Sequence, residues 1–114
     1  MNKVEAIIRP EKLDAVKNAL EQAGFLGLNV SNVTGRGVQK GVTVQARGGP
    51  LIQMDMLPKI KVEAVVADAD TETVVNVIIE TARTGAIGDG RIFITPVAEA
   101  IRIRTGERGE ESLK

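Results

Sequence analysis

The chain has 114 residues, with 15 basic side chains balanced by 15 acidic ones, and it contains no Cys, His, Tyr or Trp. This length fits one domain, and a net charge of zero gives no bulk attraction to anionic partners, so anion binding must come from local clusters. Without thiols or imidazoles, the composition excludes disulfides, thiolate metal sites, cysteine nucleophiles and imidazole bases.

Two further classes of partner are not expected. Nucleic acid is disfavoured by the zero charge and by the lack of Tyr and Trp side chains that stack on bases. No apolar run reaches the length of a membrane span, and the first residues lack the apolar region of a signal peptide. We therefore expect a cytoplasmic protein.

The first elements are a strand and a helix. Residues 3–9 alternate between apolar and charged side chains, which predicts a half-buried strand. Ile7 is an exception, because it is apolar on the charged face and so indicates that a subunit or a ligand covers this face. Pro10 suits a first helical position, and apolar spacings of three and four predict an amphipathic helix that ends at Gly24. Residues 28–34 predict a second, weaker strand.

A long stretch without regular period follows. Residues 37–56 carry no sustained alternation, and we expect a long flexible loop there. Loops longer than about 12 to 15 residues inside a compact domain are usually functional or disordered rather than simple connectors. We favour a functional loop, because binding residues concentrate on such segments.

The second half repeats the pattern of the first. Residues 57–66 predict a strand opened by Pro58, and Val65 is apolar on its charged face, as Ile7 is. Asp70 or Thr71 is expected to cap a helix whose apolar stripe ends at Ala82. Residues 91–95 predict a short strand, and residues 99–104 another, which places Ile101 and Ile103 opposite Arg102 and Arg104.

This order predicts a ferredoxin-like α+β sandwich, βαββαβ, with an antiparallel sheet and an extra C-terminal strand. Residues 1–107 form the domain, and residues 108–114 form a polar tail that we expect to fray. The helices cover one face of the sheet. The apolar Ile7 and Val65 on the other face predict a homo-oligomer that covers them.

The loop at residues 84–91 is the strongest candidate for a binding site. Gly85, Gly88 and Gly90 can take positive φ and form an anion-binding concavity of backbone N–H groups, and Arg91 adds a full charge. A tight connection with Gly85 as the helix cap explains the same residues equally well. The second basic, glycine-rich segment, which begins at Gly35, favours the first interpretation.

In this fold the two glycine segments can face each other, within one subunit or across an interface. With Arg91, Arg102 and Arg104 they suit a triphosphate, because guanidinium groups match phosphate oxygens. The alternative for Arg102 and Arg104 is a solvated strand face paired with Glu99 or Glu107. The chain has no Walker P-loop and no acidic pair for a kinase-like magnesium site, so binding without turnover is favoured over an enzyme.

Four stretches of the chain resemble the PII nitrogen-regulatory signal proteins: Lys40-Gly41 and residues 57–63, 84–93 and 101–107. The resemblance runs from Lys3 to Glu107, and its last two motifs are highly specific. It implies a homotrimer of ferredoxin-like subunits with clefts between neighbours. Each cleft would bind ATP or ADP, with 2-oxoglutarate beside Mg-ATP, and the loop at residues 37–56 would pass the ligand state to target proteins.

The resemblance also implies roles for individual residues. Ile7 and Val65 would line the adenine pocket, and Gln39 would hold the Mg²⁺ ion between ATP and 2-oxoglutarate. The residues implied around the nucleotide are Ile7, Asn29, Gly35, Gly37, Val38, Gln39, Val65, Gly88, Asp89, Gly90, Arg91, Arg102 and Arg104. Those implied around 2-oxoglutarate are Gly37, Gln39, Lys40, Gly41, Lys59 and Gly88, with Lys59 on the distal carboxylate.

The implied target is an ammonium transporter, which Arg47 would contact. The protein would associate with a membrane only through that transporter. Taken alone, Gln39 is an ordinary loop glutamine, and Lys59 and Arg47 are solvated charges. The alternatives are a relative that regulates nitrogenase, carbon metabolism or other nitrogen-metabolism enzymes, a slow ATPase, and a structural trimer with degenerate sites.

The chain departs from the family pattern at three points. Val38 stands where many members have an arginine on the phosphates, which alters the expected nucleotide affinity or the ATP-over-ADP preference unless Arg36 substitutes. The loop lacks the tyrosine that is uridylylated in many relatives and the serine that is phosphorylated in others, so covalent control at those sites is excluded. The loop is also one residue longer, which leaves the choice of target open.

Overall fold

The computed structural model describes the backbone of residues 1–45 and 51–114 and the side chains of residues 1–36 and 56–114. The main elements are β1 (Asn2–Ile8), α1 (Leu13–Gln22), β2 (Asn29–Gln45), β3 (Leu51–Val66), α2 (Thr71–Ala82) and β4 (Arg91–Pro96). Short 3-10 turns precede both helices, η1 (Pro10–Lys12) and η2 (Asp68–Asp70), and η3 (Gly109–Leu113) lies in the tail. This order confirms the predicted βαββαβ fold.

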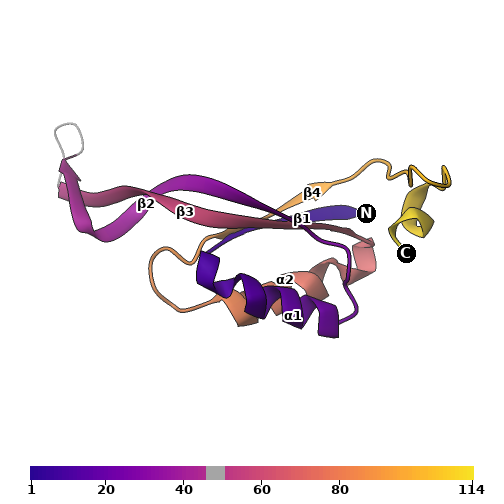
Figure 1. Ribbon diagram of the computed structural model, residues 1–114, viewed down its shortest axis with the longest axis horizontal. Helices are drawn as coiled ribbons and strands as arrows, with labels where there is room; N and C mark the ends of the chain where they lie inside the picture. The colour runs from indigo at the N-terminus through magenta and orange to yellow at the C-terminus, as the bar shows by residue number, and fades with distance from the viewer. Residues whose placement is uncertain (46–50) are drawn as a thin grey trace.

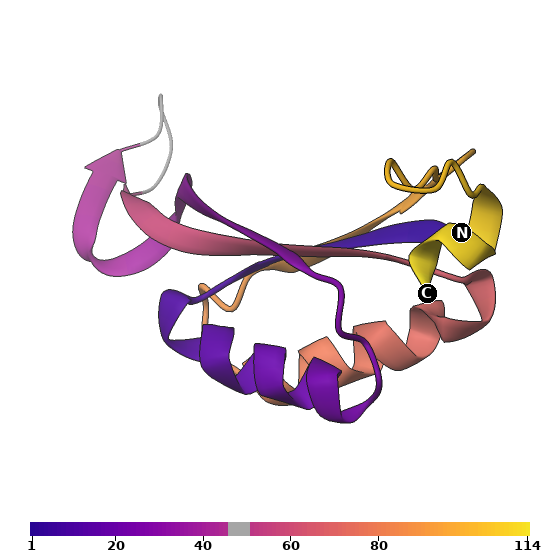
Figure 2. The ribbon, with the colours of Figure 1, turned by 45° about the vertical axis from the view of Figure 1, so that its right-hand side comes forward.

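The sheet has the strand order β2-β3-β1-β4, and each neighbouring pair is antiparallel. Figure 1 and Figure 2 show both helices on one face of this sheet, while the opposite face carries no helix. We call that bare side the open face. No helix among the described residues is long and apolar enough to span a membrane.

The core lies between the sheet and the helices. Val4, Ala6 and Ile8 are buried, as the alternation in the sequence predicted, because β1 turns every second side chain toward the helices. Val16 and Leu20 of α1 are less than 2% exposed and complete this side of the core. The rest of the buried apolar cluster comes from β3 and α2: Ile60, Val62, Ala64, Val66, Val74, Ile78 and Ala82.

The starts of the helices differ in detail from the prediction. Residues 10–12 form the 3-10 turn η1, so the first α-helix begins at Leu13. Asp70 is at the N-cap of α2 but makes no capping hydrogen bond through its side chain. Thr71 instead donates its hydroxyl to the carbonyl of Ala67 at 3.3 Å, because the preceding turn η2 brings that carbonyl within reach.

The expectation of an irregular loop over residues 37–56 is corrected by the backbone of residues 37–45 and 51–56, while residues 46–50 lie outside the described part of the chain. β2 and β3 pair from Asn29 opposite Glu63 to Gln45 opposite Leu51, with one irregularity between Val38 and Thr43. Figure 1 shows that this hairpin extends well beyond the helices. Alternation of apolar and polar residues marks a strand with one buried face. Two antiparallel strands can also pair through backbone hydrogen bonds without burying a face, and such strands leave no alternation in the sequence. The flexibility of the segment stays a prediction.

Pro58 also lies elsewhere than predicted, inside β3 and opposite Thr34 rather than at the start of the strand. The pairing of β1 with β3 ends at Ile8 opposite Ile60, so Pro58 has a strand neighbour on one side only. Proline is tolerated on an edge of this kind, because on the side without a strand neighbour its missing N–H removes no hydrogen bond.

The prediction of an extra C-terminal strand is wrong for the described chain. Residues 99–104 contribute one isolated antiparallel bridge, between Ile101 and Arg108. The backbone turns back on itself instead: the N–H of Arg102 donates to the carbonyl of Glu107 at 2.9 Å, and the N–H of Gly106 donates to the carbonyl of Arg102 at 2.7 Å. The segment therefore pairs with its own tail rather than with the sheet.

The tail beyond it was expected to fray, but it forms the turn η3. The hydroxyl of Ser112 donates to the carbonyl of Ala100 at 3.1 Å and to that of Gly109 at 2.6 Å. These hydrogen bonds fold the tail back against the preceding segment. The polar residues of the tail, which predicted fraying, instead make hydrogen bonds within this segment.

Candidate functional site

The glycine loop between α2 and β4 is built around the carboxylate of Asp89. One oxygen accepts hydrogen bonds from the backbone N–H groups of Thr84 and Gly85, each at 2.9 Å. The other accepts from the Thr84 hydroxyl and from Nε of Arg9. The Thr84 hydroxyl and backbone N–H hold the pKa of Asp89 well below its usual range, because they stabilise the charged form. Asp89 therefore fixes the shape of the loop.

Arg9 connects this loop to the end of β1. Its Nε donates to Asp89 at 3.1 Å, and its Nη2 donates to the carbonyl of Ile87 at 2.8 Å. The Arg9 and Asp89 side chains are only 23% and 25% exposed. Sequence reasoning missed Arg9. The available signal was its position, since a cation at the end of a strand, directly before Pro10, is placed to reach a neighbouring loop.

Two glycines of the loop have positive φ and a close neighbour at the Cβ position, and for Gly90 that neighbour is backbone. Gly90 has a φ of 101°, and a Cβ atom there would lie 1.7 Å from the carbonyl oxygen of Ile7. Gly88 has a φ of 105°, and its Cβ would lie 3.1 Å from Nη2 of Arg9. The loop thus packs its backbone directly on β1, which no residue with a side chain at position 90 could do.

A groove lies on the open face between this loop and the base of the β2–β3 hairpin. We call it the open-face groove, and its volume is about 500 Å³, a size typical of small-molecule sites. Its lining residues are Ile7, Gly35, Arg36, Leu57, Lys59, Ile87, Gly88, Gly90, Arg91 and Phe93. Among the described residues, the lining includes three cations and no acidic side chain, so it suits an anion.

Six of the predicted binding residues meet in this groove: Ile7, Gly35, Lys59, Gly88, Gly90 and Arg91. Lys59 also touches the glycine loop directly, because its Nζ donates to the carbonyl of Gly88 at 2.6 Å. Thus the two glycine segments that we expected to face each other do so within one chain. Arg36, which we considered as a substitute for the missing arginine at Val38, lines the same groove.

Asp89 is different from its neighbours, because it does not line the open-face groove. Both of its carboxylate oxygens already accept hydrogen bonds from the protein. A carboxylate so engaged would also repel a phosphate. The assignment of position 89 to a nucleotide stays a prediction, and its side chain acts on the site by shaping the loop.

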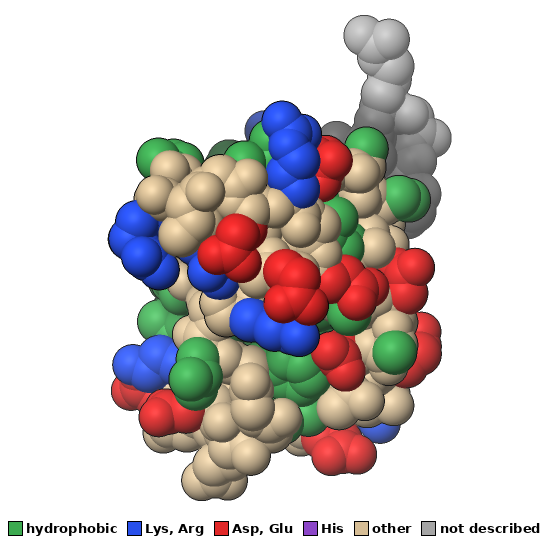
Figure 3. Space-filling view, turned by 90° about the vertical axis from the view of Figure 1, so that its right-hand side faces the viewer, with side chains coloured by type: hydrophobic (Ala, Val, Ile, Leu, Met, Phe, Trp, Pro, Cys, Tyr) green, Lys and Arg blue, Asp and Glu red, His purple; other side chains and the backbone are tan. Residues whose placement is uncertain are grey.

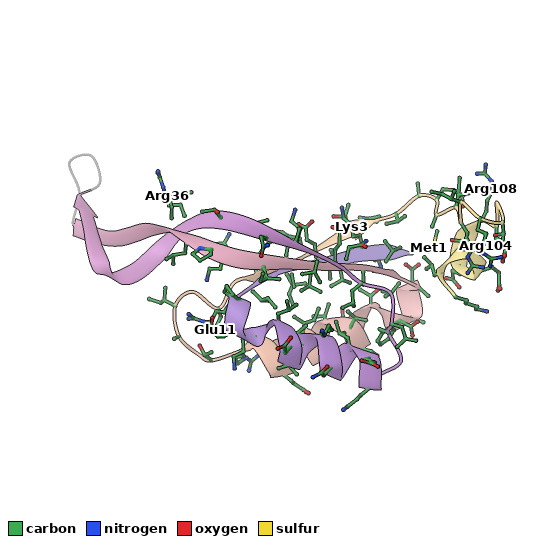
Figure 4. The ribbon with its side chains drawn as sticks, viewed as in Figure 1. Met1, Lys3, Glu11, Arg36, Arg104 and Arg108 are labelled. Atoms are coloured by element: carbon green, nitrogen blue, oxygen red, sulfur yellow. The ribbon has the colours of Figure 1, made fainter. Side chains whose placement is uncertain are left out.

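Four other predicted residues lie away from the groove: Asn29, Val65, Arg102 and Arg104. Val65 is paired with Lys3, whereas Ile7 is paired with Lys61 farther along the same strands. Asn29 begins β2 and is paired with Glu63. Figure 4 shows Arg36 on the hairpin and Arg104 near the C-terminus, at opposite ends of a molecule that is 55 Å long. One chain therefore holds two separate groups of predicted residues.

Arg102 is engaged by its own tail. Its guanidinium donates to the Glu107 carboxylate at 3.2 Å and to the backbone carbonyls of Glu111, Ser112 and Lys114. The pairing with Glu107 is the alternative that the sequence left open for this arginine. Arg104 is exposed and makes no ion pair among the described residues. Figure 3 shows acidic and basic side chains interspersed at this end of the molecule.

For several predicted residues the structure describes only the backbone, namely Gly37, Val38, Gln39, Lys40 and Gly41, and Arg47 lies outside the described residues altogether. The proposed roles of these residues in nucleotide, Mg²⁺, 2-oxoglutarate and transporter binding stay predictions. Within the described side chains, no group of three or more acidic residues could hold a metal ion.

Comparison with known proteins gives one consistent family. The family model described as nitrogen regulatory protein P-II matches residues 1–107. The protein named nitrogen regulatory protein P-II 2 of Methanothermobacter thermautotrophicus is 54% identical, over 99% of this chain and 97% of its own length. Proteins named nitrogen regulatory protein P-II from Cereibacter sphaeroides and Nostoc punctiforme are 54% and 56% identical, over 99% of this chain and their full lengths. The chain therefore belongs to the P-II family of nitrogen regulatory proteins, as its motifs predicted.

Proposed function

We propose that the protein senses nitrogen and carbon status by binding ATP or ADP and 2-oxoglutarate, and that it regulates a target, an ammonium transporter, through the β2–β3 hairpin. The observation that carries this proposal is the open-face groove. Arg36, Lys59 and Arg91 line it, no acidic side chain is among its described lining residues, and Gly88 and Gly90 line it as well. This combination favours a phosphate-bearing ligand.

The binding site is shared between copies of the chain in this proposal. Arg102 and Arg104, which the resemblance assigns to the phosphates, do not line the groove. Figure 4 shows Arg104 far along the molecule from Arg36, which does line it, so Arg104 cannot complete the groove in one chain. A second copy can supply them if the copies meet head to tail. Head-to-tail contacts that close on themselves generate rings, which agrees with the trimer implied by the resemblance.

The groove also offers a route from the ligand to the target. Gly35, Arg36 and Lys59 line it and belong to the base of the β2–β3 hairpin. Different bound ligands can contact these residues differently. Each ligand state would therefore favour a different conformation of the β2–β3 hairpin. A coupling of about 1 to 3 kcal/mol is enough for such regulation.

Calorimetry tests the sensor. The 2-oxoglutarate is expected to bind only when Mg-ATP is present, because the proposed site uses the nucleotide and its metal ion as part of the pocket. Equal binding without nucleotide would contradict this mechanism. A phosphate-release assay checks the regulatory role, since steady turnover of ATP would favour the slow ATPase.

Two lysines of β3 provide a test variant and its control for 2-oxoglutarate binding. Lys59 lines the groove, whereas Lys61, two residues farther along the same strand, lies outside the groove, near Glu5 at 3.8 Å. We expect Lys59→Ala to abolish 2-oxoglutarate binding while ATP still binds, and Lys61→Ala to bind both. Equal losses in the two variants would remove Lys59 from the site.

The transporter is tested by a pull-down with the Arg47→Ala variant. Weaker capture of an ammonium transporter than with the unmodified chain is the expected result. Unchanged capture would remove Arg47 from the proposal.

A further inference from the structure

The glycine loop contains the dipeptide Asp89-Gly90, the only aspartate in the chain that is followed by glycine. No asparagine in the chain is followed by glycine. Because glycine has no Cβ atom, its backbone nitrogen is less shielded than that of other residues and its backbone turns more freely. The nitrogen after an aspartate can then reach the carboxyl group of that aspartate. The sequence therefore holds one dipeptide suited to a spontaneous rearrangement of its backbone.

This rearrangement has two steps and needs no reactant except water. The backbone nitrogen of Gly90 bonds to Cγ of Asp89, and one carboxyl oxygen leaves as water together with the amide proton, which closes a succinimide ring. A water molecule then opens the ring at one of its two carbonyls. One opening restores aspartate, and the other gives isoaspartate, in which the main chain runs through the former side chain.

The folded loop opposes the first step. One carboxylate oxygen of Asp89 accepts hydrogen bonds from the backbone N–H groups of Thr84 and Gly85, and the other accepts from the Thr84 hydroxyl and from Nε of Arg9. Ring closure removes one of these oxygens, so it breaks hydrogen bonds whichever oxygen leaves. The same donors keep the carboxyl group ionised, and an ionised carboxylate is a poor target for a nucleophile.

The residues on both sides of Asp89 are also held in place. The carbonyl of Gly88 accepts a hydrogen bond from Nζ of Lys59 at 2.6 Å. Gly90 packs so closely on β1 that an added Cβ atom would lie 1.7 Å from the carbonyl oxygen of Ile7. Isoaspartate inserts one more carbon into the main chain between these two points, a lengthening of about 1.5 Å. The loop cannot keep both contacts after that change.

We propose that Asp89-Gly90 is a modification site, at which isoaspartate forms when the glycine loop opens and then prevents the loop from closing again. The hydrogen bonds to the Asp89 carboxylate protect the site, because they must break before the ring can close. The rate of the reaction therefore reports how often the loop opens.

The consequence for the open-face groove rests on the proposed function. Gly88 and Gly90 line this groove, one on each side of Asp89 in the sequence. ATP bound there would contact the closed loop and should slow the formation of isoaspartate. A chain that already carries isoaspartate should have lost the loop shape on which ATP binding depends.

Trypsin isolates the site for measurement. Cleavage after Arg83 and Arg91 releases residues 84–91 as one peptide, in which Asp89 is the only acidic side chain. The unmodified chain and a synthetic peptide of residues 84–91, blocked at both ends, are incubated at neutral pH without nucleotide. Chromatography with mass spectrometry then separates the aspartate and isoaspartate forms. We expect the folded chain to react more slowly than the peptide by about tenfold or more, the factor that one hydrogen bond to a charged group represents.

Two threonine variants provide a matched test of the hydrogen bonds. Thr84→Val removes a hydroxyl that donates to Asp89. Thr81→Val removes a hydroxyl that donates to the carbonyl of Val77 at 2.7 Å, within α2. We expect Thr84→Val to form isoaspartate faster than the unmodified chain, and Thr81→Val to match it. Both variants are incubated well below their own Tm, so that global unfolding does not supply the open loop.

Three results would overturn the proposal. Equal rates in the folded chain and the synthetic peptide mean that the loop does not protect the site. Equal rates in the two threonine variants mean that the hydrogen bonds to Asp89 do not control the reaction. An absence of isoaspartate from the folded chain and from Thr84→Val, after the peptide has converted, means that the loop does not open.

A thermal scan tests the effect of the product without any ligand. An aged sample should show a second transition at lower temperature, with an amplitude that follows the fraction of isoaspartate. A single unchanged transition in a sample with substantial isoaspartate would contradict the claim that the modified loop cannot close.

The modification and the proposed function fail separately. If isoaspartate forms at a rate that depends on Thr84 while the fresh chain binds no ATP, the modification site stands and the proposed function falls. If the fresh chain binds ATP while the folded chain and the peptide react equally fast, the function stands and the protected site falls.

Discussion

Gly90→Ala tests the packing that holds the glycine loop against the sheet. The φ of Gly90 is 101°, and an added Cβ atom would lie 1.7 Å from the carbonyl oxygen of Ile7 and 2.8 Å from its carbonyl carbon. Both atoms belong to the backbone of β1, which is held by strands on both sides. The clash therefore cannot be relieved by moving the end of a flexible side chain.

Two costs add in this variant. A residue with a side chain held at such a φ costs about 1 to 3 kcal/mol, and a backbone shift to relieve overpacking costs about 1 to 3 kcal/mol more. The sum is about 2 to 6 kcal/mol of unfolding free energy. At about 4 °C per kcal/mol for a chain of this size, Tm should fall by about 8 to 24 °C.

The chain supplies its own controls. Gly85 has a φ of 87° but open space around its Cβ position, so Gly85→Ala isolates the conformational cost of about 1 to 3 kcal/mol. Gly35 has no positive φ and no atom within 4 Å, so Gly35→Ala should change stability by less than about 0.5 kcal/mol. Calorimetric scans at one protein concentration, without nucleotide, measure the series. Equal losses at positions 85 and 90 would refute the role of the contact with Ile7.

Two further predictions concern stability, and a third concerns the pKa of Asp89. Asp89→Asn should lower Tm at pH 7. The difference in Tm between this variant and the unmodified chain should become smaller as pH falls below about 4. A carboxylate whose folded pKa is depressed contributes stability that is lost as it protonates. Thr84→Val removes the hydroxyl that contributes most to this shift, so NMR titration should find the Asp89 pKa closer to its ordinary value of 3.8. A calorimetric scan of Leu20→Ala should show a loss of about 2 to 5 kcal/mol, since Leu20 is 1% exposed. Leu26→Ala, at an exposed position, should cost less than about 0.5 kcal/mol.

Much of the fold could be predicted from the sequence because burial leaves a periodic signal. Val4, Ala6 and Ile8 alternate in the sequence and are buried in the structure. Helix α2 ends at Ala82, where its predicted apolar stripe ends, and it begins at Thr71, directly after the N-cap residue Asp70. Ile7 and Val65 were exceptions for a physical reason as well, since they lie on the open face that no helix covers.

The same signal failed where structure depends on pairing alone. β2 continues to Gln45 because its backbone pairs with β3, and this requires no pattern of apolar residues. The opposite error occurred at residues 99–104, where alternation predicted a strand that the described chain does not form. A periodic pattern shows that two faces differ, but it does not say which edge the segment joins.

The candidate site was partly predictable for a related reason. Glycines and arginines mark places where a backbone comes close or an anion binds, and Gly88, Gly90 and Arg91 do meet in one groove. Motifs did not distinguish a residue that touches a ligand from one that holds the loop. Asp89 and Arg9 belong to the second kind, and only their hydrogen bonds to each other and to the loop reveal it.

The separation of the two groups of predicted residues follows from the fold itself. Arg91 begins β4 next to the glycine loop, while the chain must run the length of that strand before it reaches Arg102 and Arg104. A strand of six residues spans roughly 20 Å, which is too far for one polyphosphate to bridge back along the same subunit. If both groups act on one ligand, the ligand must lie between copies of the chain. Under the proposed function, nucleotide binding would then report on assembly, because each half of the proposed site is incomplete until the next subunit is in place.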